Sequence, residues 1–246
     1  MTSSTHERDG NHPLVGVIGG VGPLATVYFL DKVVRLTAAE RDQDHVDLVV
    51  FNHATIPDRT AYILGSSSEN PGPVMASDAR RLERFGVSFL VIPCNTAAHF
   101  TDEIVAATRV PILSIVDETV AEAHARRPGV RVVGLLATSG TGASGVYQKS
   151  LADRGIACLL PDEGDQATVS RIIYEQVKSG QPVDIEAFRA VVAGLLARGA
   201  ELVLLGCTEL SVVAEDEGLL GDPLFVDSLD VLARRTIERA GGQVRG

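Results

Sequence analysis

The sequence of 246 residues contains no tryptophan, few aromatic residues (4%) and only three cysteines. Three cysteines are too few, and odd in number, for a disulfide framework, which favours a reducing compartment. All apolar runs are far shorter than the roughly 20 residues that a membrane-spanning helix needs. The polar N-terminus also lacks the apolar segment of a secretory signal. We therefore expect a cytoplasmic protein that does not enter membranes.

Positive charge is also scarce. The chain has 22 Lys and Arg against 32 Asp and Glu, which gives a net charge of -10 at pH 7. A field of this sign repels phosphate backbones and anionic membrane surfaces, so we expect neither nucleic acid nor a membrane as a partner. Small anions respond to local charge and are not excluded. With 45% hydrophobic residues, the chain has enough apolar material for a packed core, which excludes a disordered protein.

Short apolar segments alternate with longer amphipathic ones after a polar tail of residues 1–13, which we expect to be disordered. In residues 184–199 the apolar side chains recur at helical spacing, and Gly199 stands where a helix would end. This alternation predicts an α/β protein built on parallel sheets. The segments predicted as buried parallel strands are 14–18, 47–51, 88–92, 111–115, 130–136, 157–160, 201–205 and 223–226.

The two halves of the chain resemble each other. A shift of 113 residues places residues 79–96 on 192–209, and it aligns Cys94 with Cys207. A similar shift places 16–22 on 134–140. These alignments predict two pseudo-symmetric α/β lobes with the active site in the cleft between them. We expect the first lobe to comprise residues 14–115 and 220–246, and the second to comprise residues 116–219.

Cys94 and Cys207 each follow a predicted strand, at the end of the sheet where open α/β folds bind ligands. If a helix begins directly after each cysteine, its free N–H groups favour the thiolate form of the sulfur. Asn95, Thr96 and Thr208 are polar residues of the kind that cap such a helix and donate hydrogen bonds. Both positions therefore indicate a functional thiol.

Two thiols that face each other across a cleft suit inversion at a carbon centre, which needs a base on one face and an acid on the other. A single thiol would serve a decarboxylase or hydrolase equally well. Cys158 lies inside a predicted strand, where cysteine acts as a small buried hydrophobe. Neither Cys94 nor Cys207 has a Cys or His at metal-ligand spacing, and the chain has no CxxC motif. We therefore expect neither a metal nor a disulfide-exchange role.

The glycine-rich segment 16–22, GVIGGVG, stands between a predicted strand and a predicted helix, as a dinucleotide loop would. Its spacing is GxxGGxG instead of GxGxxG, and the next strand ends in Asn52 and His53 without an acidic residue. These differences disfavour NAD. The glycines instead indicate a turn at which the backbone approaches a small anionic ligand.

Six motifs stand out in the chain: GGVGPLAT (19–26), FNHATIPDRTAYIL (51–64), PCNTAAH (93–99), LLATSGT (135–141), IYEQVKSG (173–180) and GCTEL (206–210). With them the chain resembles the aspartate/glutamate racemase family, and within it the cofactor-independent aspartate racemases. The resemblance covers nearly the whole chain after residue 13. It implies two α/β domains, a homodimer, and deprotonation and reprotonation at Cα without pyridoxal phosphate or another cofactor. Cys94 and Cys207 match the two bases of the family.

The resemblance also implies how the substrate is held. Arg59 of the IPDRT motif and Lys178 of the YExVKxG motif would bind its distal carboxylate. A guanidinium can take a carboxylate bidentately, and a lysine adds a point charge. The residues expected to bind the α-carboxylate are Asn95, Thr96 and Thr208, together with the loop at Thr138 and Ser139.

A few positions depart from the family pattern. Val21 replaces the usual Met, which trims one side of the pocket wall. The extra alanine in PCNTAAH displaces His99 by one residue, about 100° around a helix, so the role of the family's histidine is not transferred to it. His53 and Ala54 also replace different residues.

Three functions remain open. The first is a racemase that interconverts L- and D-aspartate, with glutamate as the alternative acidic substrate. The second is a relative that acts on another small dicarboxylate or a hydantoin, as an isomerase or decarboxylase. The third is a catalytically silent ligand-binding protein of the same fold. Arg59 and Lys178 favour a dicarboxylate over a hydantoin, and the presence of both thiols favours catalysis by two bases.

Overall fold

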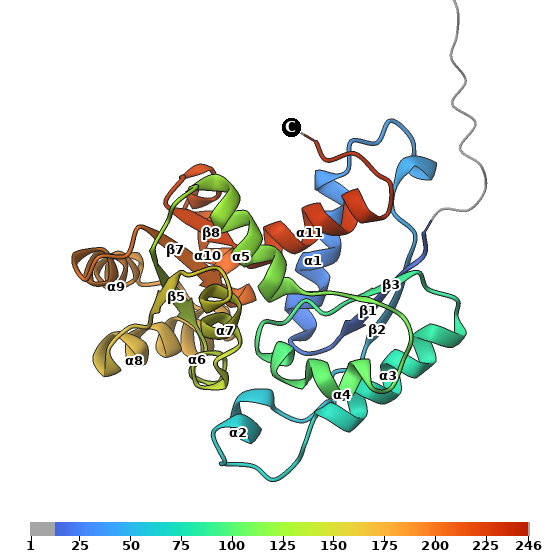
Figure 1. Cartoon of the computed structure of the whole chain (residues 1–246), viewed down its shortest axis with the longest axis horizontal. Helices are drawn as coiled ribbons and strands as arrows, with labels where there is room; N and C mark the ends of the chain where they lie inside the picture. The colour runs from blue at the N-terminus through green and yellow to red at the C-terminus, as the bar shows by residue number, and fades with distance from the viewer. Residues whose placement is uncertain (1–12, 246) are drawn as a thin grey trace, which may run out of the picture.

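The computed structural model describes residues 13–245 as two α/β lobes that lie side by side (Figure 1). The tail predicted to be disordered comprises residues 1–13, of which all but Pro13 lie outside the described residues. Each lobe contains a four-stranded parallel sheet, with strand orders β2-β1-β3-β4 and β6-β5-β7-β8. The two orders are equivalent, and all eight predicted strands are present. The predicted α/β fold with two pseudo-symmetric lobes is confirmed.

The strands and helices have the following bounds. The strands are β1 (Val15–Gly19), β2 (Leu48–Asn52), β3 (Phe89–Val91), β4 (Ile112–Leu113), β5 (Val132–Ala137), β6 (Ala157–Leu159), β7 (Leu202–Gly206) and β8 (Phe225–Asp227). The α-helices are α1 (Pro23–Leu36), α2 (Arg59–Ile63), α3 (Gly72–Arg84), α4 (Thr101–Val105), α5 (Ile115–Arg126), α6 (Ser139–Ser144), α7 (Val146–Ala152), α8 (Glu163–Arg171), α9 (Ile185–Ala197), α10 (Thr208–Asp216) and α11 (Ser228–Arg239). Short 3₁₀ segments are η1 (Asp42–Asp44), η2 (Thr96–Phe100) and η4 (Leu219–Gly221), and η3 (Ile172–Val177) is a π-helix.

Equivalent sequence features occupy equivalent places in the two lobes. α3 and α9 both precede the third strand of their sheet, and Gly86 and Gly199 follow them with φ angles of 77° and 98°. Glycine adopts these left-handed conformations without steric strain, and such a residue commonly ends a helix. β3 and β7 then lead to Cys94 and Cys207 at the carboxyl ends of the two sheets. The repeat in the sequence is therefore a repeat in the fold.

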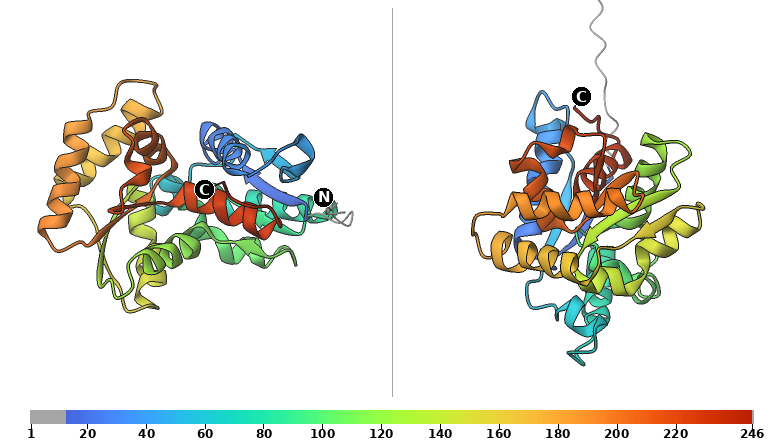
Figure 2. Two further views of the ribbon diagram at one scale, coloured as in Figure 1. Left: turned by 90° about the horizontal axis from the view of Figure 1, so that it is seen from above. Right: turned by 90° about the vertical axis from the view of Figure 1, so that its left-hand side faces the viewer.

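The last helix of each half packs against the other half. α5 follows the first sheet but contacts α7, β7 and β8, whereas α11 follows the second sheet and contacts α1. The two helices also contact each other, and α11 lies between the lobes in Figures 1 and 2. The prediction that residues 220–246 return to the first lobe needs a correction, because β8 pairs with β7 of the second sheet. The chain returns at residue 228, where α11 begins.

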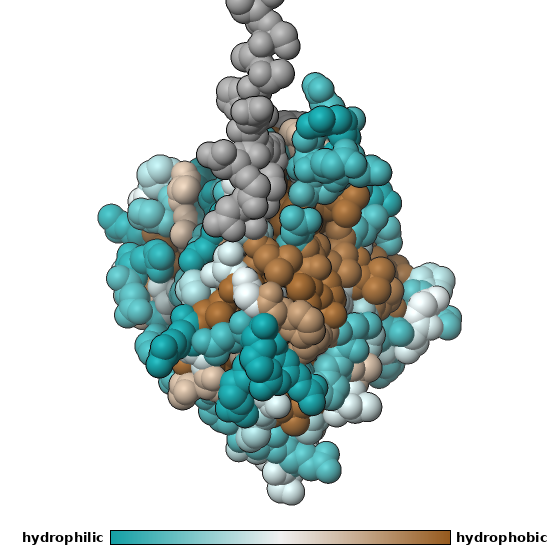
Figure 3. All heavy atoms as spheres, turned by 90° about the vertical axis from the view of Figure 1, so that its right-hand side faces the viewer, coloured by the Kyte–Doolittle hydropathy of each residue, from teal (hydrophilic) through white to brown (hydrophobic). Residues whose placement is uncertain are grey.

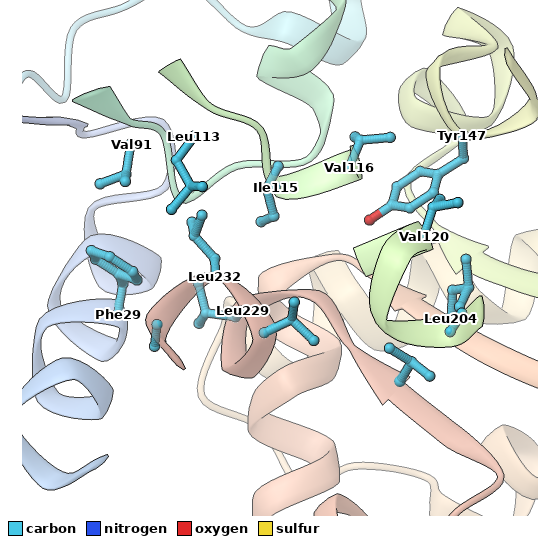
Figure 4. Close-up of a cluster of buried hydrophobic side chains, with 14 of the residues drawn as sticks. Phe29, Val91, Leu113, Ile115, Val116, Val120, Tyr147, Leu204, Leu229 and Leu232 are labelled. Atoms are coloured by element: carbon cyan, nitrogen blue, oxygen red, sulfur yellow. The ribbon is translucent and has the colours of Figure 1, made fainter. Parts of the chain in front are cut away.

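A buried hydrophobic cluster joins the two sheets through these helices (Figure 4). Phe29 of α1 and Leu113 of β4 belong to the first lobe, and Leu204 of β7 belongs to the second. Val120 of α5 and Leu232 of α11 lie in the same cluster. Burial of each such side chain stabilises the fold by about 1.5–3 kcal/mol. The lobes therefore share one core along this side.

A buried ionic group also holds three helices together. Lys32 of α1 is 4% exposed, and its Nζ lies 3.3 Å from Glu215 of α10 and 3.6 Å from Asp230 of α11. The hydroxyl of Tyr28 donates a hydrogen bond to the same Glu215. Because an unpaired buried charge is strongly destabilising, these contacts fix the positions of α1, α10 and α11 relative to one another.

The exposed apolar residues gather on the first lobe. Figure 3 shows a hydrophobic area on the face of that lobe directed away from the second lobe. The large hydrophobic residues that are exposed are Leu24, Val27, Val34, Leu64, Phe85 and Val105 in the first lobe and Leu196 in the second. Within residues 13–245, no helix is long and apolar enough to cross a membrane.

Candidate active site between the lobes

A narrow cavity lies between the lobes at the carboxyl ends of both sheets. Its walls include all of the predicted site residues except Ser139. The hydroxyl of Ser139 instead lies 3.5 Å from that of Ser170. Val21, the residue that departs from the family pattern, also lines the cavity. The predicted residues in the wall are Arg59, Cys94, Asn95, Thr96, Thr138, Lys178, Cys207 and Thr208.

Both cysteines reach the cavity from the end of the third strand of their sheet. Cys94 stands between β3 and η2, and Cys207 is the residue that caps the N-terminus of α10. They are 8% and 6% exposed. Cys158 lies in β6 and does not line the cavity, and burial raises the pKa of its thiol to about 11. The structure thus brings together the two thiols that the repeat pairs and separates the third.

Glu209 determines the surroundings of Cys207. The sulfur of Cys207 lies 3.0 Å from Oε2 of Glu209, which also accepts a hydrogen bond of 3.2 Å from Thr208. Burial and the neighbouring Glu209 carboxylate raise the pKa of the Cys207 thiol well above its usual value. We expected the helix N-terminus to favour a thiolate here. This expectation is wrong for Cys207, because burial and a carboxylate at contact distance outweigh the partial charge of the helix.

Arg59 enters the cavity from the first turn of α2. Its Nη1 donates to the carbonyl oxygens of Ile56 and Pro57 at 3.3 and 3.0 Å. Its Nε is buried and has no hydrogen-bond partner among the described residues. Gly140 permits α2 to lie against α6, since a Cβ there would be 2.8 Å from the Cα of Thr60. The guanidinium is therefore fixed by its own loop and keeps donor capacity for an anion.

Lys178 reaches the same cavity from the other lobe. It directly follows the π-helix η3, and its backbone N–H donates to the carbonyl of Ile173 at 3.1 Å. Its Nζ lies 4.6 Å from the centre of the Tyr174 ring and 3.6 Å from Oε1 of Glu209. Burial opposes the charged form, but Glu209 and its other neighbours raise the pKa of Lys178 above the usual value. The side chain therefore carries a positive charge.

Hydroxyl groups from both lobes meet on the side of Cys94. Oγ1 of Thr96 lies 3.1 Å from that of Thr138 and 2.8 Å from that of Thr141. Asn95 is held more firmly, because its amide donates to Ser228 at 3.0 Å and its carbonyl accepts from Tyr147 at 2.6 Å. Asn95 thus fixes the segment that carries Cys94, and the threonines present a neutral polar wall.

An outer hollow of about 400 Å³ adjoins the cavity and shares several wall residues with it, among them Arg59, Lys178 and Glu209. The glycine-rich segment contributes Gly20 and Gly22 to this hollow. The segment therefore stands at the mouth of the site. Most residues that line the outer hollow but not the cavity are apolar: Pro23, Leu24, Ala25, Ala54, Ile56, Val177 and Val212.

The two histidines singled out in the sequence lie outside both spaces. Nδ1 of His53 lies 2.7 Å from a carboxylate oxygen of Asp78. The ring of His99 packs edge-on against Phe100, with 4.9 Å between the ring centres. Neither histidine lines the cavity or the outer hollow.

Several wall residues were not predicted: Asp58, Thr60, Tyr174 and Glu209. All four belong to the motifs that carry the family resemblance. The repeat contains a signal for one of them, because the shift that aligns the cysteines also aligns Thr96 with Glu209. Within residues 13–245, no three His, Cys, Asp or Glu side chains form a cluster that could hold a metal ion.

Comparisons with known proteins agree with this architecture. The family model described as Asp/Glu/Hydantoin racemase matches residues 18–236. The broad specificity amino-acid racemase RacX of Bacillus subtilis is 28% identical over 230 residues, which cover 91% of this chain and 96% of RacX. The structure of an aspartate racemase from Picrophilus torridus has a TM-score of 0.78 and 31% identity, and the alignment covers 95% of this chain and 96% of that one. An aspartate racemase homologue from Pyrococcus horikoshii has a TM-score of 0.74 and 26% identity, with coverages of 92% and 98%.

Proposed function

Because the chain belongs to the Asp/Glu/hydantoin racemase family, we propose that it interconverts L- and D-aspartate without a cofactor. Glutamate is the second acidic substrate that we propose. The observation that carries the proposal is the meeting of two thiols and two cationic side chains in one small cavity between the lobes. The cations suit a dicarboxylate, and the thiols suit proton transfer at a carbon centre.

The proposed reaction is an exchange of protons at Cα. One cysteine, as thiolate, removes the Cα proton, and the other, as thiol, delivers a proton to the opposite face. The reverse reaction exchanges the two roles. For the enantiomer whose Cα proton faces Cys94, we propose that Cys94 removes that proton and that Cys207, whose pKa is raised by burial and by Glu209, donates the new one. Arg59 and Lys178 hold the distal carboxylate, and the hydroxyls of Thr96 and Thr138 face the α-carboxylate.

A wider substrate range is the second candidate. The outer hollow has an apolar wall that aspartate does not need, and Leu24 in that wall is 64% exposed. RacX, a similar protein, carries a name that states broad specificity. Larger amino acids would extend from the inner cavity into this hollow.

Exchange of the Cα proton in D₂O, followed by NMR for a panel of amino acids and dicarboxylates, tests these proposals. We expect rapid exchange for aspartate, slower exchange for glutamate, and little for alanine. Rapid exchange of large neutral amino acids favours the second candidate. Exchange of none of these compounds, with intact thiols, would contradict the racemase proposal and favour a silent binding protein.

We also propose that the enzyme is a homodimer that buries part of the apolar surface of the first lobe. Leu24, Val27 and Val34 lie on the exposed face of α1. Light scattering after gel filtration should give the mass of two chains. The double variant Val27→Glu, Val34→Glu should give the mass of one, since it places two charges on that face. If the wild-type protein is a monomer, the dimer proposal is wrong. If the double variant is still a dimer, the interface lies elsewhere.

A further inference from the structure

Every α-amino acid brings a positive ammonium group into the site, and this group needs an acceptor when it leaves water. Two carboxylate side chains line the inner cavity, Asp58 and Glu209. Asp58 is already used by the fold, because its Oδ1 accepts a hydrogen bond of 2.6 Å from the backbone of Ala61 and caps α2. The contacts of Glu209 are instead with other residues of the cavity wall, Cys207, Thr208 and Lys178, so Glu209 is the carboxylate that a ligand can recruit without uncapping a helix.

Glu209 also stands at the right place for such a contact. Its Oε2 lies 3.0 Å from the sulfur of Cys207, and its side chain is 13% exposed. In an amino acid the nitrogen is bonded directly to Cα, at about 1.5 Å. An ammonium group held on Glu209 therefore brings Cα next to Cys207, the group that must exchange a proton with it.

The residue that the repeat pairs with Glu209 has the complementary character. The repeat places Thr96 at the position equivalent to Glu209, and its hydroxyl meets those of Thr138 and Thr141. Neutral hydroxyls can donate hydrogen bonds to a carboxylate, whereas Glu209 can only repel one. The residue two positions after Cys94 can therefore donate a hydrogen bond to a carboxylate, whereas the residue two positions after Cys207 can accept one from an ammonium group.

We propose that Glu209 is the receptor for the substrate ammonium group, and that this group displaces the contacts of Glu209 with Cys207 and Lys178. This inference rests on the proposed function. Glu209 contacts the sulfur of Cys207 at 3.0 Å and the Nζ of Lys178 at 3.6 Å. An ammonium group that takes over Glu209 releases the thiol toward Cα and releases Lys178 toward the distal carboxylate. A dicarboxylate without an amine cannot do this, because both of its charges are repelled by Glu209.

The high pKa of the Cys207 thiol agrees with this arrangement, since Glu209 favours its protonated form until the ammonium arrives. Glu209 would then act as a specificity residue as well. It would admit amino dicarboxylates and reject dicarboxylates that lack nitrogen. Binding of the amine to Glu209 would also release the Cys207 thiol and Lys178, which the proposed reaction needs.

Calorimetric binding of aspartate and of succinate, which differ by the amine, tests the inference. Wild-type protein should bind aspartate at least about tenfold more tightly than succinate, the size of one charge-assisted hydrogen bond. Glu209→Gln should change the two affinities in opposite directions. Aspartate should bind about tenfold more weakly, and succinate should bind more tightly because Lys178 is no longer paired. Glu217→Gln, which removes a charge at the far end of α10, should change neither affinity.

Two results would overturn the inference. One is a wild-type protein that binds succinate as tightly as aspartate, a measurement that needs no variant. The other is a Glu209→Gln protein that loses affinity for both ligands together, as a purely structural residue would. Failure of the proposed function is seen separately, in the absence of Cα exchange by the wild type, because binding of the amine does not require turnover.

Discussion

The two halves of the molecule have the same sheet order, yet they differ in charge at equivalent positions. The repeat aligns Thr96 with Glu209, two residues after each cysteine, and Ser114 with Asp227, at the start of α5 and α11. In both pairs the first half has a neutral hydroxyl and the second half a carboxylic acid. The backbone is thus repeated, whereas the charge beside each sulfur is not.

This difference makes the two thiols chemically unequal. Both lie at the end of a third strand, but Cys207 has a carboxylate at 3.0 Å and Cys94 has a cluster of threonine hydroxyls on its side. A racemase acts on two mirror-image substrates, so it needs two bases in mirrored positions without needing two identical surroundings. The fold thus places the two sulfurs at equivalent positions, and the side chain two residues later gives them different neighbours.

The largest expected effect concerns the sulfurs themselves. Cys94→Ser and Cys207→Ser should each lower kcat for aspartate racemisation by roughly 10²–10⁴-fold, because a hydroxyl is a much weaker acid than a thiol. Cys158→Ser is the matched control and should keep nearly full activity, since Cys158 lies outside the cavity. Polarimetry or chiral chromatography measures the rates. Near wild-type turnover in either of the first two variants would contradict the two-base mechanism.

The next effect concerns the cations that each half contributes. Arg59→Ala should lower kcat/KM for aspartate by about a hundredfold or more, since loss of one partner of a buried charge pair costs about 2–5 kcal/mol. Lys178→Ala should lower it less, because a point charge on a side chain that is 39% exposed orients a carboxylate less than a fixed guanidinium does. Preference for aspartate over alanine should fall in both variants. If Arg59→Ala kept the full preference for aspartate over alanine, the proposal that Arg59 recognises the charge of the substrate would be wrong.

A third prediction sharpens the comparison of Ser114 with Asp227. Burial raises the pKa of Asp227 to about 6, and its Oδ2 has no hydrogen-bond partner among the described residues. The folded protein therefore binds a proton between about pH 6 and pH 4 that the unfolded chain does not, so this group adds stability as the pH falls through that window. Its ionised form costs about 3 kcal/mol at pH 8.

Asp227→Asn should accordingly stabilise the protein at pH 8 and change little at pH 4, as measured by urea unfolding at both pH values. Ser114→Ala removes the hydroxyl that accepts from the backbone of Asp117 at 3.2 Å. It should cost about 1 kcal/mol at either pH. If Asp227→Asn changed the stability equally at both pH values, the helix caps Ser114 and Asp227 would not differ in the pH dependence of their contribution.

The last prediction is that removal of metals and carbonyl cofactors has no effect on activity. Dialysis against EDTA and treatment with hydroxylamine, under reducing conditions, should leave racemisation unchanged, because the proposed chemistry uses only side chains of the chain itself. Activity that falls and then returns on addition of pyridoxal phosphate or a divalent metal would contradict this prediction.

Much of the fold was predictable, because buried parallel strands are continuous apolar runs and the two halves repeat them. The boundary at residue 220 was wrong, since periodicity does not reveal which sheet β8 joins. The role of Glu209 was missed for a related reason. Its spacing from Cys207 is visible in the sequence, but only the turn of α10 shows that its carboxylate bends back to the sulfur. Likewise, the structure alone shows that Ser139 faces Ser170.

The exchange of α5 and α11 between the lobes has a mechanical consequence. A chain cut between the halves would leave each fragment without the helix that covers its own apolar face, so the halves are not separable units. α5 packs against α11, and Lys32 of α1 pairs with Glu215 of α10, so these contacts join the two lobes. No residue of α5 or α11 is in the wall of the cavity. The position of one lobe relative to the other is therefore held by helices that do not line the cavity.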